Sequence, residues 1–252
     1  MNLQFKILIA VSVIISSNSY SSLKILCLHG GGGSAASFNA MPGMQDLIDD
    51  LPQFEFVFVD SPLSSGIWYE DPPSKENPTQ DRSWANDSVL FLDSFVEANG
   101  PFYGLLGYSQ GVPMALVYLV QSETHFDKIF LFNGYLPETH LGLLELIDEA
   151  KPFEQPTMIF LARNDIFFEL GQSLKSKFAE FTEIISETSG HALPQRSDPV
   201  FADTIQLFDA VTSPRNYKLR IFSSQNMLDW SLINETSVNS NHEIIFLKAE
   251  IE

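Results

Sequence analysis

Apolar residues along this chain gather in short, nearly continuous runs that are separated by longer stretches of mixed character. The runs are rich in Val, Ile, Leu and Phe, and they cover residues 23–28, 54–59, 101–106, 128–132, 157–162 and 181–187. Continuous runs of this length are typical of strands in a parallel sheet, because helices cover both faces of such a sheet. We therefore predict six buried strands.

The stretches between these runs have helical character. They cover residues 37–50, 83–99, 110–122, 139–150, 169–179 and 199–212. In the second of them, Trp84, Val89, Leu92 and Val96 are interspersed with acidic residues in a pattern that favours a two-faced helix. Strands that alternate with helices predict an α/β fold with a doubly wound, mostly parallel sheet and helices on both faces.

Two regions interrupt this alternation. Residues 61–81 hold four prolines together with Gly66, Trp68 and Tyr69, and irregular loops of this length are usually lids or binding loops. The stretch after Pro214 contains two strand-like runs. They cover residues 218–222 and 243–247, and the connector between them becomes polar over residues 234–241. The place of this tail in the fold stays open.

The N-terminus has the pattern of a secretory signal peptide. Lys6 precedes a mostly apolar run of nine residues at 7–15, and the small residues Ser17 and Ser19 follow it. We expect cleavage after Ser19, since the apolar run is too short for an ordinary membrane span. The predicted parts are thus a signal at 1–19, an α/β domain at 20–213 and a C-terminal extension at 214–252. The expected location is secreted or within the endomembrane lumen; the alternative is an extra strand and a cytoplasmic protein.

Composition narrows the classes of partner. The chain has 252 residues, 44% of them hydrophobic, which suffices for one α/β domain. A formal charge of −18 repels nucleic-acid phosphates and anionic membrane surfaces, so we expect neither as a partner. The single cysteine, Cys27, excludes an internal disulfide and lies in the first apolar run. No metal-ligand spacing or nucleotide-binding motif is present, and the oligomeric state stays open.

The sequence Gly-Tyr-Ser-Gln-Gly at residues 107–111 lies between a strand-like run and the helical stretch that follows. A G-x-S-x-G motif in this context is typical of a nucleophile elbow. The chain reverses so sharply there that the residues two before and two after the serine must be small. The turn would lift the hydroxyl of Ser109 above the edge of the sheet.

Glycines follow the first strand, in the sequence His-Gly-Gly-Gly-Gly at residues 29–33. Glycine lets backbone amides approach a ligand closely, so the amides of Gly31 and Gln110 are candidates to hold an oxyanion. A plain flexible turn is the alternative. We interpret His29 as structural, with hydrogen bonds to this loop, and Asp60 at the end of the next strand as a turn or helix-cap residue.

An acid and a base follow two later strands. Asp165 comes after the run at 157–162, and His191 lies in a loop with Gly190 and Pro194. The order Ser109, Asp165, His191 is that of α/β-hydrolases. His191 would then take the proton of Ser109, Asp165 would orient the imidazole, and an acyl-enzyme would be released by water. The expected substrate is a small-molecule ester or thioester.

Apolar residues in loops near this edge are candidates to line an acyl pocket. They are Trp68, Tyr69, Phe167, Phe168 and Leu193. The alternative, which has equal weight, is that several of them pack the loops against the sheet.

Five segments together resemble the FSH family of serine hydrolases over residues 23–211. They are Cys-Leu-His-Gly at 27–30, Phe-Val-Phe-Val-Asp at 56–60, Gly-Tyr-Ser-Gln-Gly at 107–111, Arg-Asn-Asp at 163–165 and Gly-His-Ala-Leu-Pro at 190–194. The resemblance implies an α/β-hydrolase fold, a Ser109–Asp165–His191 triad, no metal or organic cofactor, and esterase or thioesterase activity. The four-glycine run and the tail beyond Pro214 differ from the commonest members.

Two other functions use the same residues. An acyltransferase would employ the same triad but exclude water, and only analysis of products with an added acceptor separates it from a hydrolase. A non-catalytic binding module on this fold would normally lack at least one triad member, and all three are present here.

Overall fold

The computed structural model describes residues 23–72, 74–209, 216–223 and 231–239. The chain divides into two units, of which Tyr20–Asp209 is the larger. The predicted signal at 1–19 lies outside the described residues. The three-part division predicted from the sequence stays a prediction.

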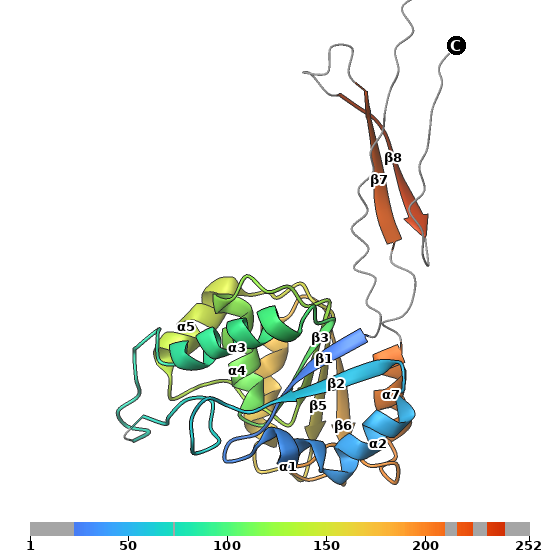
Figure 1. The fold of residues 1–252 in the computed structure, drawn as a ribbon. Helices are drawn as coiled ribbons and strands as arrows, with labels where there is room; N and C mark the ends of the chain where they lie inside the picture. Colours follow the sequence, from blue (N-terminus) through green and yellow to red (C-terminus); the bar gives the residue numbers. More distant parts are fainter. Residues whose placement is uncertain (1–22, 73, 210–215, 224–230, 240–252) are drawn as a thin grey trace, which may run out of the picture. The chain divides into compact units, whose positions relative to one another are not determined.

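A six-stranded parallel sheet forms the centre of the larger unit (Figure 1). Its strands are β1 (Leu23–Leu28), β2 (Phe54–Val59), β3 (Gly104–Tyr108), β4 (Lys128–Phe132), β5 (Thr157–Ala162) and β6 (Phe181–Ser186). They lie in the order β2-β1-β3-β4-β5-β6. The predicted α/β fold with its parallel sheet is confirmed.

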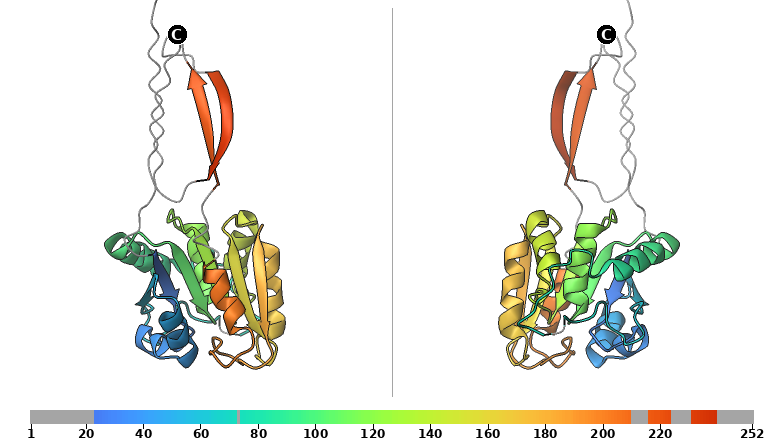
Figure 2. Two further views of the ribbon diagram at one scale, coloured as in Figure 1. Left: turned by 90° about the vertical axis from the view of Figure 1, so that its right-hand side faces the viewer. Right: turned by 90° about the vertical axis from the view of Figure 1, so that its left-hand side faces the viewer.

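Helices cover both faces of this sheet, as Figure 2 shows from two sides. They are α1 (Ala35–Asn39), α2 (Pro42–Asp50), α3 (Asn86–Asn99), α4 (Gly111–Gln121), α5 (Leu141–Ala150), α6 (Phe168–Gly171), the 3₁₀ helix η1 (Gln172–Lys177) and α7 (Phe201–Asp209). Helices α3, α4 and α5 lie on one face, and α1, α2 and α7 lie on the other (Figures 1 and 2).

The two helical layers explain why the apolar runs are continuous. In β4, Ile129 and Leu131 belong to the cluster that includes the buried side chains of α4 and α5. Phe130, between them, points to the other layer and stacks on Phe208 of α7 with ring centroids 4.0 Å apart. Both faces of β4 are therefore buried, and for this reason the residues in the middle of the strand are all apolar.

The predicted boundaries differ from the structure at two places that matter for the site. The helix expected at 37–50 is two helices, because Met41 is extended before Pro42 and the proline begins α2. The strand expected at 101–106 is shifted towards its C-terminal end, since Gly107 and Tyr108 pair with Leu131 and Phe132 of β4. Strand β3 thus ends directly before Ser109.

The second unit contains an antiparallel pair, β7 (Asn216–Ser223) and β8 (Ser231–Asn239), with a register shift between Ile221 and Phe222. The strand predicted at 218–222 lies within β7. The polar stretch expected as a connector forms most of β8, where it pairs with β7. The run at 243–247 lies outside the described residues. Within the described ranges, no helix has the length and apolar character that crossing a membrane requires.

Candidate active site

Ser109 lies at the tight turn between β3 and α4, in the left-handed region at φ +52°. The turn is closed by glycines on both sides. A Cβ on Gly107 would lie 2.6 Å from the carbonyl oxygen of Gly111, and one on Gly111 would lie 2.3 Å from that of Leu28. Any side chain there would displace backbone, so the sequence of the turn is dictated by its close packing.

His191 hydrogen-bonds to both other members of the predicted triad. Its Nε2 is 2.9 Å from Ser109 Oγ, and its Nδ1 is 2.8 Å from Asp165 Oδ2. With the proton on Nδ1 donated to the carboxylate, Nε2 is free to accept from the serine hydroxyl. The side chain of Asp165 is 1% exposed, whereas that of His191 is 32% exposed. The acid is therefore shielded from water, and the base opens to the solvent.

Sheet order brings these residues together. Ser109 follows β3, Asp165 follows β5 and His191 follows β6, so all three lie at the edge formed by the carboxyl ends of the strands. This edge is where ligands bind in open α/β sheets.

The glycine loop after β1 contacts the nucleophile turn. A Cβ on Gly30 would lie 3.0 Å from Ser109 Cβ, and one on Gly31 would lie 3.2 Å from Gln110 Oε1. His29 fixes the base of this loop: its Nε2 accepts from Ser61 N at 3.1 Å, and its Nδ1 donates to Gly30 O at 2.8 Å. Burial lowers the pKa of His29, which keeps the ring neutral for both bonds.

Asp60 lies at the end of the neighbouring strand, β2. Its Oδ1 accepts from the amide of Ala35, the first residue of α1, at 2.7 Å. Asp60 thus binds the first amide of α1 from a neighbouring strand, whereas Ser34 is the residue that caps this helix.

The proline-rich loop is attached to the same turn through Gln110. The Oε1 atom of Gln110 accepts from Trp68 N at 3.0 Å, and its Nε2 donates to Tyr69 O at 3.2 Å. The Trp68 indole donates to His29 O at 2.8 Å. Trp68, Tyr69 and Leu193 are 1%, 3% and 1% exposed, so their burial supports packing rather than a surface that a substrate reaches.

Phe167 is the predicted pocket residue that does reach the site. Its ring meets the His191 ring edge-on at a centroid distance of 5.1 Å. Tyr135, which the sequence reading missed, lies 4.9 Å from Phe167. Burial and then the charge of Asp71 raise the pKa of Tyr135 to about 12, so the phenol stays neutral. Ile166, which precedes Phe167 in the chain, is 84% exposed, and we refer to Tyr135, Ile166 and Phe167 together as the apolar rim.

Several polar side chains hold the loop that carries His191. Asp198 accepts from the hydroxyls of Ser186, Thr188 and Ser189. The Tyr108 hydroxyl donates to His191 O at 2.7 Å. Serines and an aspartate in a loop are common, so nothing in the sequence alone marked these contacts.

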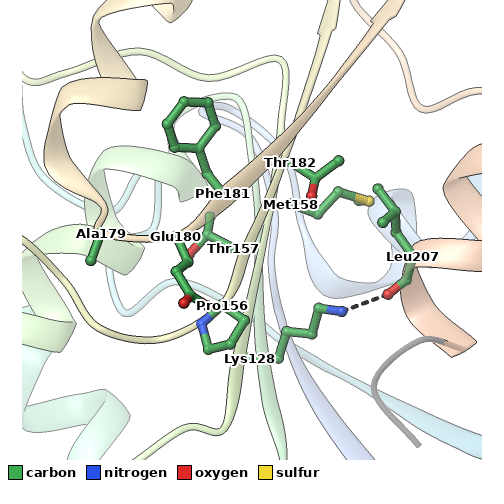
Figure 3. A pocket seen from close by; sticks show the side chains of 9 residues that line it. All are labelled: Lys128, Pro156, Thr157, Met158, Ala179, Glu180, Phe181, Thr182 and Leu207. Carbon is green, nitrogen blue, oxygen red and sulfur yellow. Dashed lines mark hydrogen bonds between the residues drawn. The ribbon is translucent and has the colours of Figure 1, made fainter. Parts of the chain in front are cut away.

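A cavity of about 400 Å³ lies at the opposite edge of the sheet, at the amino ends of β4, β5 and β6 (Figure 3). Its lining includes Lys128, Met158, Phe181 and Leu207, and the Lys128 amine donates to Leu207 O at 2.6 Å. No triad member borders it. Over the described ranges, no cluster of His, Cys, Asp and Glu could hold a metal ion.

Comparison with curated proteins finds relatives that are named esterases. The chain is 31% identical over 208 residues to the esterase C25G4.2 of Caenorhabditis elegans, a match that covers 71% of this chain and 90% of the relative. It is 27% identical over 195 residues to the esterase FUS5 of Gibberella fujikuroi, with 69% and 81% covered.

Solved structures share the fold. SOBER1 of Arabidopsis thaliana aligns with a TM-score of 0.55 at 19% identity, over 76% of this chain and 99% of that one. The esterase PE8 aligns with the same TM-score and identity, over 77% and 94%. The pattern of the FSH1 serine hydrolases matches residues 17–201. This chain therefore belongs to the FSH1 serine hydrolase family and is an enzyme with an α/β-hydrolase fold.

Proposed function

We propose that this protein hydrolyses carboxylic esters or thioesters through an acyl-enzyme on Ser109. The observation that carries the proposal is the unbroken hydrogen-bonded array from Ser109 through His191 to the buried Asp165. Relatives named esterases support ester chemistry. Hydrolysis of thioesters rests on the same array, because an acyl carbonyl is attacked in the same way in both compounds.

In the first half of the reaction, Ser109 Oγ attacks the acyl carbonyl carbon while His191 Nε2 takes its proton. The imidazolium then gives that proton to the leaving oxygen or sulfur, and the acyl group stays on Ser109. Asp165 keeps the Nδ1 proton in place and stabilises the transient positive charge. In the second half, His191 takes a proton from the water that attacks the acyl-enzyme. The imidazolium returns this proton to Ser109 Oγ as the acyl bond breaks, which releases the acid and restores the hydroxyl.

The amides of Gly31 and Gln110 are our candidates for the oxyanion hole. Two observations support them: the glycine loop contacts Ser109 and Gln110, and Gln110 directly precedes the first residue of α4. Amides at such a position point towards a ligand. Each donor of this kind contributes roughly 3–4 kcal/mol to the transition state.

The apolar rim supports an acyl group as the recognised part of the substrate. The Phe167 ring contacts the rings of His191 and Tyr135, and Ile166, which precedes Phe167 in the chain, is exposed to solvent. An apolar chain attached to the carbonyl would cover this surface and release water from it. We therefore propose substrates with a hydrophobic acyl chain.

The proposal is tested with Ser109→Ala. Removing the nucleophile should lower kcat for p-nitrophenyl esters by at least about 10⁴-fold. It should also abolish labelling by a serine-directed fluorophosphonate. Ser94→Ala, which changes an exposed serine on α3, is the matched control and should keep both. Labelling or turnover that survives in Ser109→Ala would place the nucleophile elsewhere.

Transfer of the acyl group to another acceptor is the alternative that this experiment does not separate. Products formed in the presence of a short-chain alcohol distinguish the two. A hydrolase gives mainly free acid, and an acyltransferase gives mainly the new ester.

A further inference from the structure

Asn133 directly follows β4, the strand between those that lead to Ser109 and Asp165. It is fully buried, and its backbone has φ +45°. Asparagine adopts the left-handed region more readily than other non-glycine residues, although the conformation still costs about 1 kcal/mol or more. Among the described residues, Ser109 is the only other non-glycine residue with positive φ.

The side chain of Asn133 connects two loops that carry triad members. Its Nδ2 donates to Gly190 O at 3.1 Å and to Ala192 O at 2.7 Å, the carbonyls on either side of His191. Its Oδ1 accepts from the amide of Ala162 at 2.8 Å, at the end of the strand that leads to Asp165. A single planar amide therefore fixes the distance between the base loop and the acid strand.

The backbone next to Asn133 extends this connection to the nucleophile. The amide of Ser109 donates to Phe132 O at 3.0 Å. The amide of Asn133 donates to Phe160 O at 2.9 Å, in the strand of the acid. Residues 132 and 133 thus contact the segments of all three triad members.

No other side chain supplies these bonds at this length. The site needs two donors at one end and an acceptor at the other, which is the pattern of a primary amide. Aspartate would place a second acceptor against two carbonyl oxygens, and leucine would leave all three backbone groups without partners. Glutamine is longer by one methylene in a buried position.

We propose that Asn133 is a positioning residue, which holds the loop of His191 and the strand of Asp165 at the separation that the Ser109–His191–Asp165 array needs. The proposal rests on the proposed function. It assigns Asn133 no contact with the substrate. Its expected effect is on the rate of the chemical step, because a small displacement of the base from the nucleophile lowers the rate strongly.

Two variants test the role. Asn133→Gly permits the positive φ and removes the amide, and Asn133→Asp keeps the size and the acceptor and removes the donors. We expect each to lower kcat by on the order of 10- to 100-fold with KM unchanged. Ile147→Ala in α5 is the control for lost stability, since Ile147 is buried away from the triad and should leave kcat unchanged.

A second readout needs no turnover. The proton of His191 Nδ1, shared with Asp165, gives a low-field resonance in the ¹H NMR spectrum of the resting enzyme when the pair is held together. This signal should weaken or vanish in both Asn133 variants and persist in Ile147→Ala. If Ser109→Ala kept full activity, the proposed function would fall, and the resonance would still report whether Asn133 holds the pair.

Folded Asn133 variants with wild-type kcat and an unchanged low-field resonance would overturn the proposal. It would also be overturned if neither variant folded, because Asn133 would then be needed for the fold itself. A loss of kcat that Ile147→Ala reproduces would likewise assign the effect to stability alone.

Discussion

The two described non-glycine residues with positive φ lie at the carboxyl edge of the sheet, next to the proposed site. Ser109 and Asn133 both have positive φ, and residues of this kind cost about 1–3 kcal/mol each and persist only where the surroundings impose the conformation. Here the surroundings do impose it, since the Ser109 amide is bonded to β4 and the Asn133 side chain to three backbone groups. The backbone strain therefore lies at the same edge of the sheet as the proposed active site.

Lys128 is a residue-scale exception at the opposite edge. Its side chain is buried in the lining of the cavity, and burial lowers its pKa to about 8. An unfolded lysine has a pKa near 10.4, so between about pH 8 and 10.4 the unfolded chain binds more protons. The contribution of Lys128 to stability therefore rises with pH through this window, and below it the buried charge is a cost.

We predict that Lys128→Met raises the free energy of unfolding at pH 7. The shift corresponds to roughly 3 kcal/mol at most, and we expect about 1 kcal/mol because solvent reaches the cavity and the bond to Leu207 O is lost. Urea unfolding at pH 7 and pH 10 measures the difference. The gain should shrink at the higher pH, whereas exposed Lys75→Met should show no such trend. A gain that grows with pH would contradict the assignment.

At the scale of elements, the loops that follow the strands determine which side chains lie at the carboxyl edge of the sheet. The loop at 61–81 has the length and composition expected of a lid or binding loop, and Gln110 binds it through Trp68 N and Tyr69 O. Gly66 adds a second attachment, because its carbonyl accepts from Gly32 N at 2.8 Å. This loop is therefore attached by hydrogen bonds to the turn of Ser109 and to the glycine loop.

The segment after β5 leads to a prediction about the preference for long acyl chains. Phe167 lies there beside His191, and the residue before it, Ile166, is exposed. With p-nitrophenyl esters of increasing length, kcat/KM should rise as methylenes cover the rim, by up to roughly fourfold for each fully buried methylene.

Phe167→Ala should reduce the dependence on chain length more than it reduces activity on the shortest ester. Phe91→Ala, which removes a partly exposed aromatic side chain from α3, should leave the dependence intact. Equal kcat/KM for short and long esters in the wild-type enzyme would refute a hydrophobic acyl site.

At the scale of the molecule, the proposed catalytic residues and the six-stranded sheet belong to one compact unit. The unit Tyr20–Asp209 contains the triad, and the family pattern ends at residue 201 within it. A domain with its own core folds independently as a rule.

We predict that a chain ending at Asp209 keeps kcat/KM and the thermal unfolding midpoint of the full chain. Ester kinetics and calorimetry of the two proteins compare them directly. Loss of activity in the shortened chain, while its midpoint stays the same, would mean that residues 210–252 take part in the site.

The sequence by itself determined the fold class and pointed to the three residues of the proposed triad. Continuous apolar runs require two covering layers, and a residue that follows such a run must lie at the catalytic edge. Ser109, Asp165 and His191 each follow a predicted strand, and their order along the chain, which is that of α/β-hydrolases, grouped them.

Only the tertiary structure decided which other residues surround them. Trp68, Tyr69 and Phe167 are all aromatic residues of loops, so the sequence does not distinguish them. In the structure Trp68 and Tyr69 are buried, whereas Phe167 contacts His191, because the conformation of a loop depends on contacts with distant residues. Asn133 hydrogen-bonds to Gly190 and Ala192, which lie 57 and 59 positions further along the chain. A local pattern records burial and periodicity, whereas the direction of one buried amide is determined by the partners that the completed fold brings to it.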